Sequence, residues 1–237
     1  QSRETRSREL DIIVTKDTII TVRLQSIVTL KSLYNNLNIY EEERAKYMNQ
    51  GAGYLLFAII EDLWESSMTK LTRINKGLGD IEKQIFEGRE GPMVEEISLT
   101  KADIINFWKI VNPQTDTMAE LRKEGVEFFG SEMRPYFAHL LTTCHYIQHD
   151  LSTFKETIAA LEETNNSLLT FKTNEIVKLL TMFSVVVFPL TLIAAIFGMN
   201  TKYLPLVGMR GDFWLISAVM LIGTFFMIAY FRKRGWI

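Results

Sequence analysis

Two uncharged runs near the C-terminal end constrain this fold more than any other feature. Residues 179–199 contain no Asp, Glu, Lys or Arg, and neither do residues 213–231. A helix of about 20 apolar residues spans a hydrocarbon layer of roughly 30 Å. Only residues 200–212 join the two runs. This pattern predicts a helical hairpin in a lipid bilayer, attached to a water-soluble region that makes up most of the chain.

The charges that flank the runs predict their orientation. Arg232, Lys233 and Arg234 follow the second run, and Lys172 and Lys178 precede the first. Because basic flanking residues favour the cytoplasmic side, we expect both termini in the cytoplasm and an inner-membrane location. The formal net charge is only -2 and no basic stripe marks the soluble part, so nucleic acid is not an expected partner.

A single long helix is predicted to lead into the first run. Residues 131–197 contain no glycine, and Pro135 lies in the first turn, where a proline is tolerated. In the first half of this segment, apolar residues recur in alternating steps of three and four, with Asn165 as a register-setting polar position. This seam could pack against the same chain, a neighbouring subunit or both. It comprises Phe137, Leu140, Cys144, Ile147, Leu151, Phe154, Ile158, Leu161, Asn165 and Leu168.

The region before this helix mixes strands and helices. The β-branched residues at 10–14 and 18–22 predict a β-hairpin, which is marginal in water without a larger sheet. Residues 24–37 suggest a short helix, and residues 49–51 a break. The apolar spacing at 52–86 predicts a long helix, followed by a turn at 88–92, a returning helix at 93–111 and further helix at 114–123.

One face of the first run gathers small and hydroxyl residues. Steps of three and four place together Asn174, Val177, Thr181, Ser184, Phe188, Thr191, Ala195 and Gly198. Several copies around an axis would form a narrow channel with a polar entrance, apolar collars and a polar exit. The alternative is that small residues only allow membrane helices to pack closely.

The first run ends in Gly198-Met199-Asn200, and with this ending the chain resembles the CorA family of divalent-cation channels. The resemblance covers most of the chain, and further residues carry it: Tyr54-Leu55-Leu56, Arg134-Pro135-Tyr136-Phe137, Asn174-Glu175, Pro189-Leu190-Thr191, Tyr203-Leu204-Pro205 and Arg232-Lys233-Arg234. The resemblance implies a homopentamer that passes Mg²⁺, with Co²⁺ and Ni²⁺ tolerated, and a longer N-terminal α/β domain. We therefore expect this chain to be a fragment or a short version.

The resemblance also implies roles for residues along the first run. Gly198, Met199 and Asn200 would form the selectivity filter, where a ring of neutral amide oxygens suits the tightly hydrated Mg²⁺ ion. Asn174 would lie at the cytoplasmic mouth of the pore. The remaining assignments are hydrophobic gates at Val177, Leu180 and Phe188, and a basic ring at Arg232, Lys233 and Arg234.

The expected architecture is a mostly α membrane protein with a truncated cytoplasmic α/β domain. Residues 1–130 form the cytoplasmic domain and residues 131–178 the stalk part of the long helix. Residues 179–199 form the pore helix, 200–212 the external loop, 213–231 the second transmembrane helix and 232–237 the basic tail. The expected partners are divalent cations, the lipid bilayer and further copies of the chain.

Several departures and alternatives remain open. Thr201-Lys202 follows the filter, whereas relatives often carry acidic residues there. This difference makes a Zn²⁺ transporter of the same architecture the first alternative to a Mg²⁺ channel. A membrane-anchored coiled-coil scaffold is the second. Regulatory Mg²⁺ is implied near His139, but the neighbouring residues 138–142 contain no acid, and these sites stay unassigned. Glu61, Asp62, Glu65, Asp80 and Glu82 could serve instead, although a solvated helix face explains them equally well.

Other candidate chemistry is weak. His145 and His149 are spaced for metal binding beside the single cysteine, Cys144, but we interpret them as solvated helix surface. The sequence offers no nucleophile–base pairing, phosphate-binding glycine loop or two-carboxylate site. An enzyme is therefore not expected.

Overall fold

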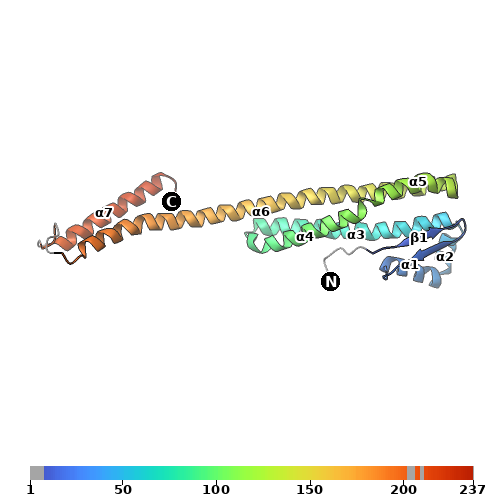
Figure 1. Cartoon of the computed structure of the whole chain (residues 1–237), viewed down its shortest axis with the longest axis horizontal. Coiled ribbons are helices and arrows are strands. Elements are labelled where there is room, and N and C mark those ends of the chain that lie inside the picture. The colour runs from blue at the N-terminus through green and yellow to red at the C-terminus, as the bar shows by residue number, and fades with distance from the viewer. Residues whose placement is uncertain (1–7, 202–205, 209–210, 237) are drawn as a thin grey trace. The chain divides into compact units, whose positions relative to one another are not determined.

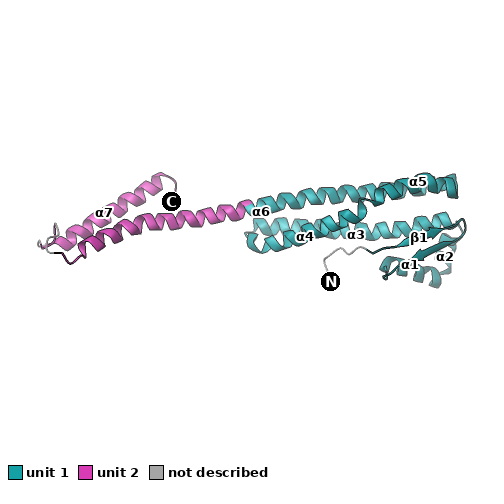
Figure 2. Ribbon diagram, in the orientation of Figure 1, with its two compact units in different colours: residues 1–166 teal, residues 167–237 magenta. Residues whose placement is uncertain are grey.

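The computed structural model describes residues 8–201, 206–208 and 211–236. The chain divides into two compact units, residues 1–166 and residues 167–237 (Figure 2). Helix α6 (Arg134–Phe197) is the predicted long helix, and Ser131–Met133 before it forms a 3₁₀ turn, η1. Pro135 is the second residue of α6, where its missing N–H is tolerated, as predicted.

The first unit is built on a helical hairpin. Helices α3 (Ala52–Phe86) and α4 (Glu90–Val111) lie antiparallel, and α5 (Gln114–Phe129) follows α4 (Figure 1). The first part of α6 completes the bundle. At the N-terminal side are β1 (Asp11–Val14), β2 (Ile19–Val22), α1 (Val28–Ile39) and α2 (Glu41–Met48).

The predicted seam of α6 is the core of this unit. Phe137, Leu140, Cys144, Ile147, Leu151 and Ile158 are each 0% exposed. Within the same chain, α3 and α4 contribute the facing side chains Ile85, Ile97, Ile104 and Val111, all at most 2% exposed. The seam therefore packs against the hairpin of its own chain. Leu168, the last predicted member, is only half-buried and belongs to the second unit.

Polar contacts fix the register of α6 against the hairpin. The Gln148 Nε2 donates to the Asn112 Oδ1 at 2.8 Å, and the Lys101 Nζ lies 2.5 Å from the Glu162 Oε2. The buried Asn165 donates from Nδ2 to the Glu90 carbonyl oxygen at 3.1 Å, at the turn between α3 and α4. Asn165 is therefore a polar position in the seam, as the heptad spacing predicted.

The predicted β-hairpin is present as a two-stranded antiparallel sheet. Its register pairs Asp11 with Val22 and Val14 with Ile19. Two strands alone are marginal in water, so they need an apolar surface to pack on. Helices α1 and α3 provide it, because Ile12 and Ile19 pack against a cluster of Leu33, Leu37 and Ile59.

The structure corrects four predicted boundaries. The turn predicted at 88–92 is too long, because α4 begins at Glu90. Pro92 then lies in the first turn of α4, where no intrahelical bond from its nitrogen is needed. Helix α5 runs to Phe129 instead of residue 123, and α1 begins and ends later than predicted. Helix α2 was not predicted, because most of its residues are charged and the others show no apolar period.

Candidate functional site

The second unit consists of the end of α6 and helix α7 (Asp212–Lys233). Both α6 and α7 are long and apolar enough to cross a membrane. The predicted run 213–231 lies wholly within α7. The predicted run 179–199 lies within α6 except for Gly198 and Met199, because α6 ends at Phe197.

Burial divides the end of α6 into two faces. One face is covered, and Met182 on this face is only 7% exposed. The other helix of the second unit is α7, so we take this covered face as the α7 side. The half-buried residues Val186, Pro189, Leu190, Ile193 and Phe197 continue this face. At 3.6 residues per turn, the predicted pore face lies on nearly the opposite side of the helix.

The predicted pore-lining residues share that opposite face and are mostly exposed. Val177, Leu180 and Phe188, the predicted gates, are 53%, 63% and 71% exposed. Asn174, Thr181, Thr191 and Ala195 are exposed as well, and Ser184 is half-buried. The structure thus brings these side chains onto one face of one helix. Large exposed apolar groups of this kind mark a surface that meets lipid or other chains.

The hydroxyl groups on this face all donate to the backbone. The Thr181 Oγ1 donates to the Val177 carbonyl at 2.8 Å, the Ser184 Oγ to the Leu180 carbonyl at 2.8 Å, and the Thr191 Oγ1 to the Val187 carbonyl at 2.9 Å. A hydroxyl has one hydrogen and two lone pairs. Since the hydrogen is committed to the helix, each oxygen offers its lone pairs as an acceptor.

The Gly-Met-Asn segment turns the chain directly after α6. The Gly198 N–H donates to the Ala194 carbonyl at 2.9 Å, and the Met199 N–H to the Ile196 carbonyl at 3.3 Å. A Cβ on Gly198 would lie 3.1 Å from the Ala194 oxygen, so even a methyl group would be tight. Met199 is 56% exposed and Asn200 is also exposed. An exposed amide therefore follows directly after the end of the predicted pore face.

The side chain of Asp212 binds backbone groups at the start of α7, and the end of α7 carries the three predicted basic residues. The Asp212 carboxylate accepts the Gly208 N–H at 3.1 Å and the Phe213 N–H at 2.7 Å. Arg232, Lys233 and Arg234 are exposed at the other end of α7. The predicted loop features Lys202 and Tyr203-Leu204-Pro205 lie outside the described residues.

The histidines of the first unit lie at the surface. The His139 Nε2 lies 3.3 Å from the Glu61 Oε1 and links α6 to α3. Beside it, partial burial and the nearby Glu65 and Glu61 carboxylates raise the pKa of Asp62 above its usual value. His145 and His149 are exposed. Among the described residues, no group of three or more His, Cys, Asp or Glu side chains could hold a metal ion.

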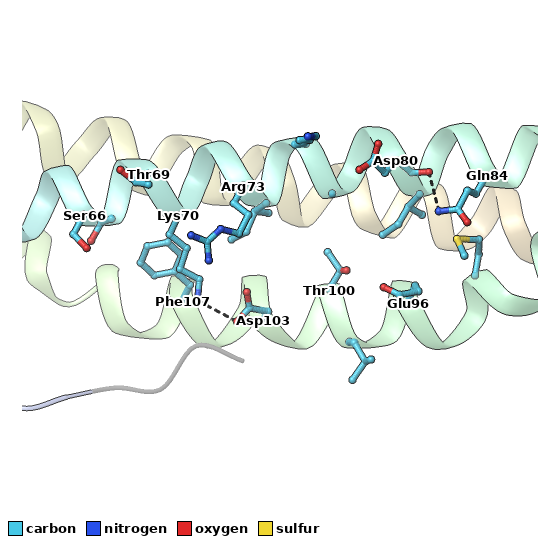
Figure 3. Close-up of a pocket in the computed structure, with 17 residues that line it drawn as sticks. Ser66, Thr69, Lys70, Arg73, Asp80, Gln84, Glu96, Thr100, Asp103 and Phe107 are labelled. Atoms are coloured by element: carbon cyan, nitrogen blue, oxygen red, sulfur yellow. Dashed lines mark hydrogen bonds and ion pairs between the residues drawn. The ribbon is translucent and has the colours of Figure 1, made fainter. Parts of the chain in front are cut away.

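A polar groove of about 1010 Å³ runs between α3 and α4 (Figure 3). Ser66, Lys70 and Arg73 line it from α3, and Glu96 and Asp103 line it from α4. The Lys70 Nζ lies 3.3 Å from the Asp103 Oδ1 and 5.3 Å from the centre of the Phe107 ring. These contacts hold the two helices of the hairpin together, and we assign no chemistry to the groove.

Comparison with known proteins shows the family to which this chain belongs. The family of CorA-like Mg²⁺ transporter proteins matches residues 1–233. The chain belongs to that family. A cobalt/magnesium transport protein CorA from Thermotoga maritima is 28% identical over 201 residues, which cover 82% of this chain and 57% of the relative. One from Methanocaldococcus jannaschii is 25% identical over 228 residues, which cover 96% of this chain and 71% of the relative.

Solved structures of the family share the fold. The complete structure of the CorA magnesium transporter from M. jannaschii matches with a TM-score of 0.82 and 24% identity, covering 95% of this chain and 71% of that one. The full-length CmaX protein matches with a TM-score of 0.75 and 20% identity, covering 97% and 68%. This CorA-like chain therefore spans between about half and three quarters of the relatives that it matches.

Proposed function

We propose that this CorA-like chain forms a membrane channel for divalent cations, with Mg²⁺ as the main ion and Co²⁺ and Ni²⁺ as tolerated ones. The observation that carries the proposal is the polar face of α6, which lies opposite the α7 side and ends at Gly198-Met199-Asn200. The names of two relatives, both cobalt/magnesium transport proteins, support the same ions.

The acceptor character of this face suits a hydrated cation. Water molecules around a cation point their hydrogens outward, so they need acceptors along the wall of the channel. Thr181, Ser184 and Thr191 offer such acceptors because their own hydrogens are bound to the helix backbone. Mg²⁺ loses its water reluctantly, so a wall that binds the water shell favours passage without dehydration.

The channel needs several copies of the chain, and we infer a homopentamer. One helix cannot enclose water, but copies of α6 around an axis place the amide of each Asn200 in one ring. Asn174 then forms a polar ring at the other end, and Val177, Leu180 and Phe188 form apolar collars that close by dewetting. Arg232, Lys233 and Arg234 follow the second span as a basic ring on the cytoplasmic side.

The same reasoning places the chain in the membrane. Residues 179–199 and 213–231 cross it, residues 200–212 lie outside, and residues 1–178 and 232–237 lie in the cytoplasm. The basic residues at 232–234 support this orientation, since such clusters favour the cytoplasmic side of an inner membrane. The α3–α4 hairpin and the first part of α6 then form a cytoplasmic bundle.

Ion flux into proteoliposomes tests the proposal. The vesicles hold a Mg²⁺-sensitive dye, and wild type is compared with Asn200→Ala at equal protein content. We expect wild type to pass Mg²⁺ and the variant to lose most of the flux while it keeps the oligomer size of wild type. Flux of Zn²⁺ alone would indicate the zinc-transporting alternative. A well-folded wild type that passes no divalent ion would refute the channel and favour a membrane-anchored scaffold.

A matched pair of variants tests the acceptor face. Thr191→Val removes a hydroxyl from the predicted pore face, whereas Thr224→Val removes one from α7 that makes the same bond, to the Met220 carbonyl at 2.8 Å. We expect Mg²⁺ flux to fall several-fold in Thr191→Val and to stay near wild type in Thr224→Val. Equal effects of the two substitutions would contradict the assignment of this face.

A further inference from the structure

The end of α7 carries a folded cap of three aromatic residues, Tyr230, Phe231 and Trp236, to which the proposed channel gives no role. The Trp236 N–H donates to the Phe231 carbonyl at 3.0 Å, and the Gly235 N–H donates to the Arg232 carbonyl at 3.2 Å. This pair of bonds is the Schellman motif, in which the chain reverses direction at the end of a helix. Gly235 permits the reversal because its φ is +70°, a value that disfavours residues with a Cβ.

The reversal folds Trp236 back onto the helix. Its ring stacks on the ring of Phe231, with centroids 5.7 Å apart and an angle of 12° between the planes. Phe231 is 7% exposed, whereas Trp236 remains 40% exposed and Tyr230 beside it 56% exposed. The cap therefore exposes the rings of Trp236 and Tyr230 and buries that of Phe231.

Basic residues lie next to these aromatic residues in the chain, and one of them contacts a ring. The Arg234 guanidinium lies 5.7 Å from the centre of the Tyr230 ring, and Arg232 and Lys233 are exposed in the last turn of α7. Tryptophan and tyrosine prefer the boundary between hydrocarbon and water, where an apolar ring can be buried while a polar edge stays wet. Arginine and lysine at the same depth match the phosphates of lipid headgroups in charge.

We propose that Tyr230, Arg234, Gly235 and Trp236 form an anchor in the lipid headgroup layer that fixes the depth at which α7 leaves the membrane. The partner is a phospholipid headgroup, because the surface joins exposed aromatic rings to guanidinium groups at the end of an apolar helix. The anchor rests on the proposed membrane span of α7. Its apolar rings lie toward the acyl chains and its cations lie toward the phosphates.

Tryptophan fluorescence in vesicles tests the anchor with the full chain. The vesicles contain equal parts phosphatidylcholine and phosphatidylglycerol, with a nitroxide quencher either on the headgroup or deep in the acyl chain. Comparison of wild type with Trp236→Phe gives the quenching of Trp236. Comparison with Trp214→Phe gives the quenching of Trp214, which lies at the start of α7. We expect the headgroup label to quench Trp236 at least twice as strongly as the deep label.

Two glycine variants test the role of the cap. Gly235→Ala should lower the headgroup quenching of Trp236 by about half, because alanine disfavours the positive φ and releases the ring. Gly223→Ala is the control, since a Cβ at this position in α7 meets nothing within 4 Å and the φ is ordinary. An equal loss in both variants would overturn the role of the cap.

The outcomes also separate the anchor from the channel. Lipid quenching of Trp214 without lipid quenching of Trp236 would overturn the anchor and leave the membrane span in place. Equal or stronger quenching of Trp236 by the deep label would overturn its placement among the headgroups. Absence of lipid quenching at both positions would refute the span itself, and with it both proposals.

Discussion

Gly125 offers a sharp test of the packing in the first unit. It lies within α5, and a Cβ at this position would come within 2.8 Å of Phe137 Cε2 and 3.0 Å of Leu121 Cδ1. Phe137 is 0% exposed, so its ring lies among other core side chains and cannot simply turn out into solvent. Overpacking of this kind costs about 1–3 kcal/mol. In Gly125→Ala this cost opposes the gain of about 1 kcal/mol that alanine brings to a helix interior.

Gly79 in α3 supplies the matched control. A Cβ there meets nothing within 4 Å, so Gly79→Ala keeps the helix gain without the clash. The free energy needed to open the helical bundle of the first unit should therefore differ between the two variants by the overpacking cost, about 1–3 kcal/mol. We expect Gly79→Ala to be more stable than wild type and Gly125→Ala to be the less stable variant of the two.

The single cysteine of the chain provides the assay. Cys144 is 0% exposed in the core, and its burial raises the pKa of the thiol, so a maleimide reacts only when the bundle opens. When closing is fast, the labelling rate changes tenfold for each 1.4 kcal/mol or so of opening free energy. Gly125→Ala should thus be labelled about 5–150 times faster than Gly79→Ala. Labelling of Gly125→Ala that is no faster than that of Gly79→Ala would refute the packing argument.

Two further substitutions address polar groups in the same unit. Asp62→Asn should raise the thermal midpoint at pH 7. The raised pKa of Asp62 means that the fold favours the protonated carboxyl. The stability that the protonated form contributes is fully present below pH 3.8 and is lost as the pH rises through the raised pKa. Its advantage over wild type in a circular-dichroism melt should fade as the pH falls through the raised pKa of Asp62 and should be gone below pH 3.8. A constant advantage would contradict the argument, and exposed Glu82→Gln is the control. Asn165→Ala should cost about 1–3 kcal/mol, because it leaves the Glu90 carbonyl without this donor, and should speed Cys144 labelling about 5–150-fold. The exposed Asn75→Ala in α3 should label near the wild-type rate, and similar rates for both asparagine variants would argue against the role of the buried one.

The parts of the fold that sequence patterns predict are those with a strong apolar period. The steps of three and four from Phe137 to Asn165 predicted a buried seam, and these residues are the core of the first unit. The glycine at 51 marked a break, and it has a φ of +86° before α3 begins. The two uncharged runs predicted the helices that are long and apolar enough to span a membrane.

Features that depend on tertiary contacts could not be predicted in the same way. Helix α2 has no apolar stripe, and its helical state rests on its neighbours α1 and α3 instead of on its own period. The contact between His139 and Glu61 joins residues far apart in the sequence, and no pattern connects them. The bonds from Thr181, Ser184 and Thr191 to the backbone also emerge only from side-chain geometry. The roles of the filter and gate residues stay predictions.

The bond between Asn165 and Glu90 has an evolutionary consequence. It ties the turn between α3 and α4 to a fixed height on α6, at the last residues of the first unit. Deleting one helical turn from α3 and α4 alone would draw this turn away from Asn165 and leave a buried polar group without its partner. Insertions and deletions that keep this bond must therefore occur together in α3, α4 and α6. Their lengths must also keep the apolar residues of α6 facing the hairpin. Chain length in this bundle is accordingly a shared property of three helices, and none of them can lengthen alone.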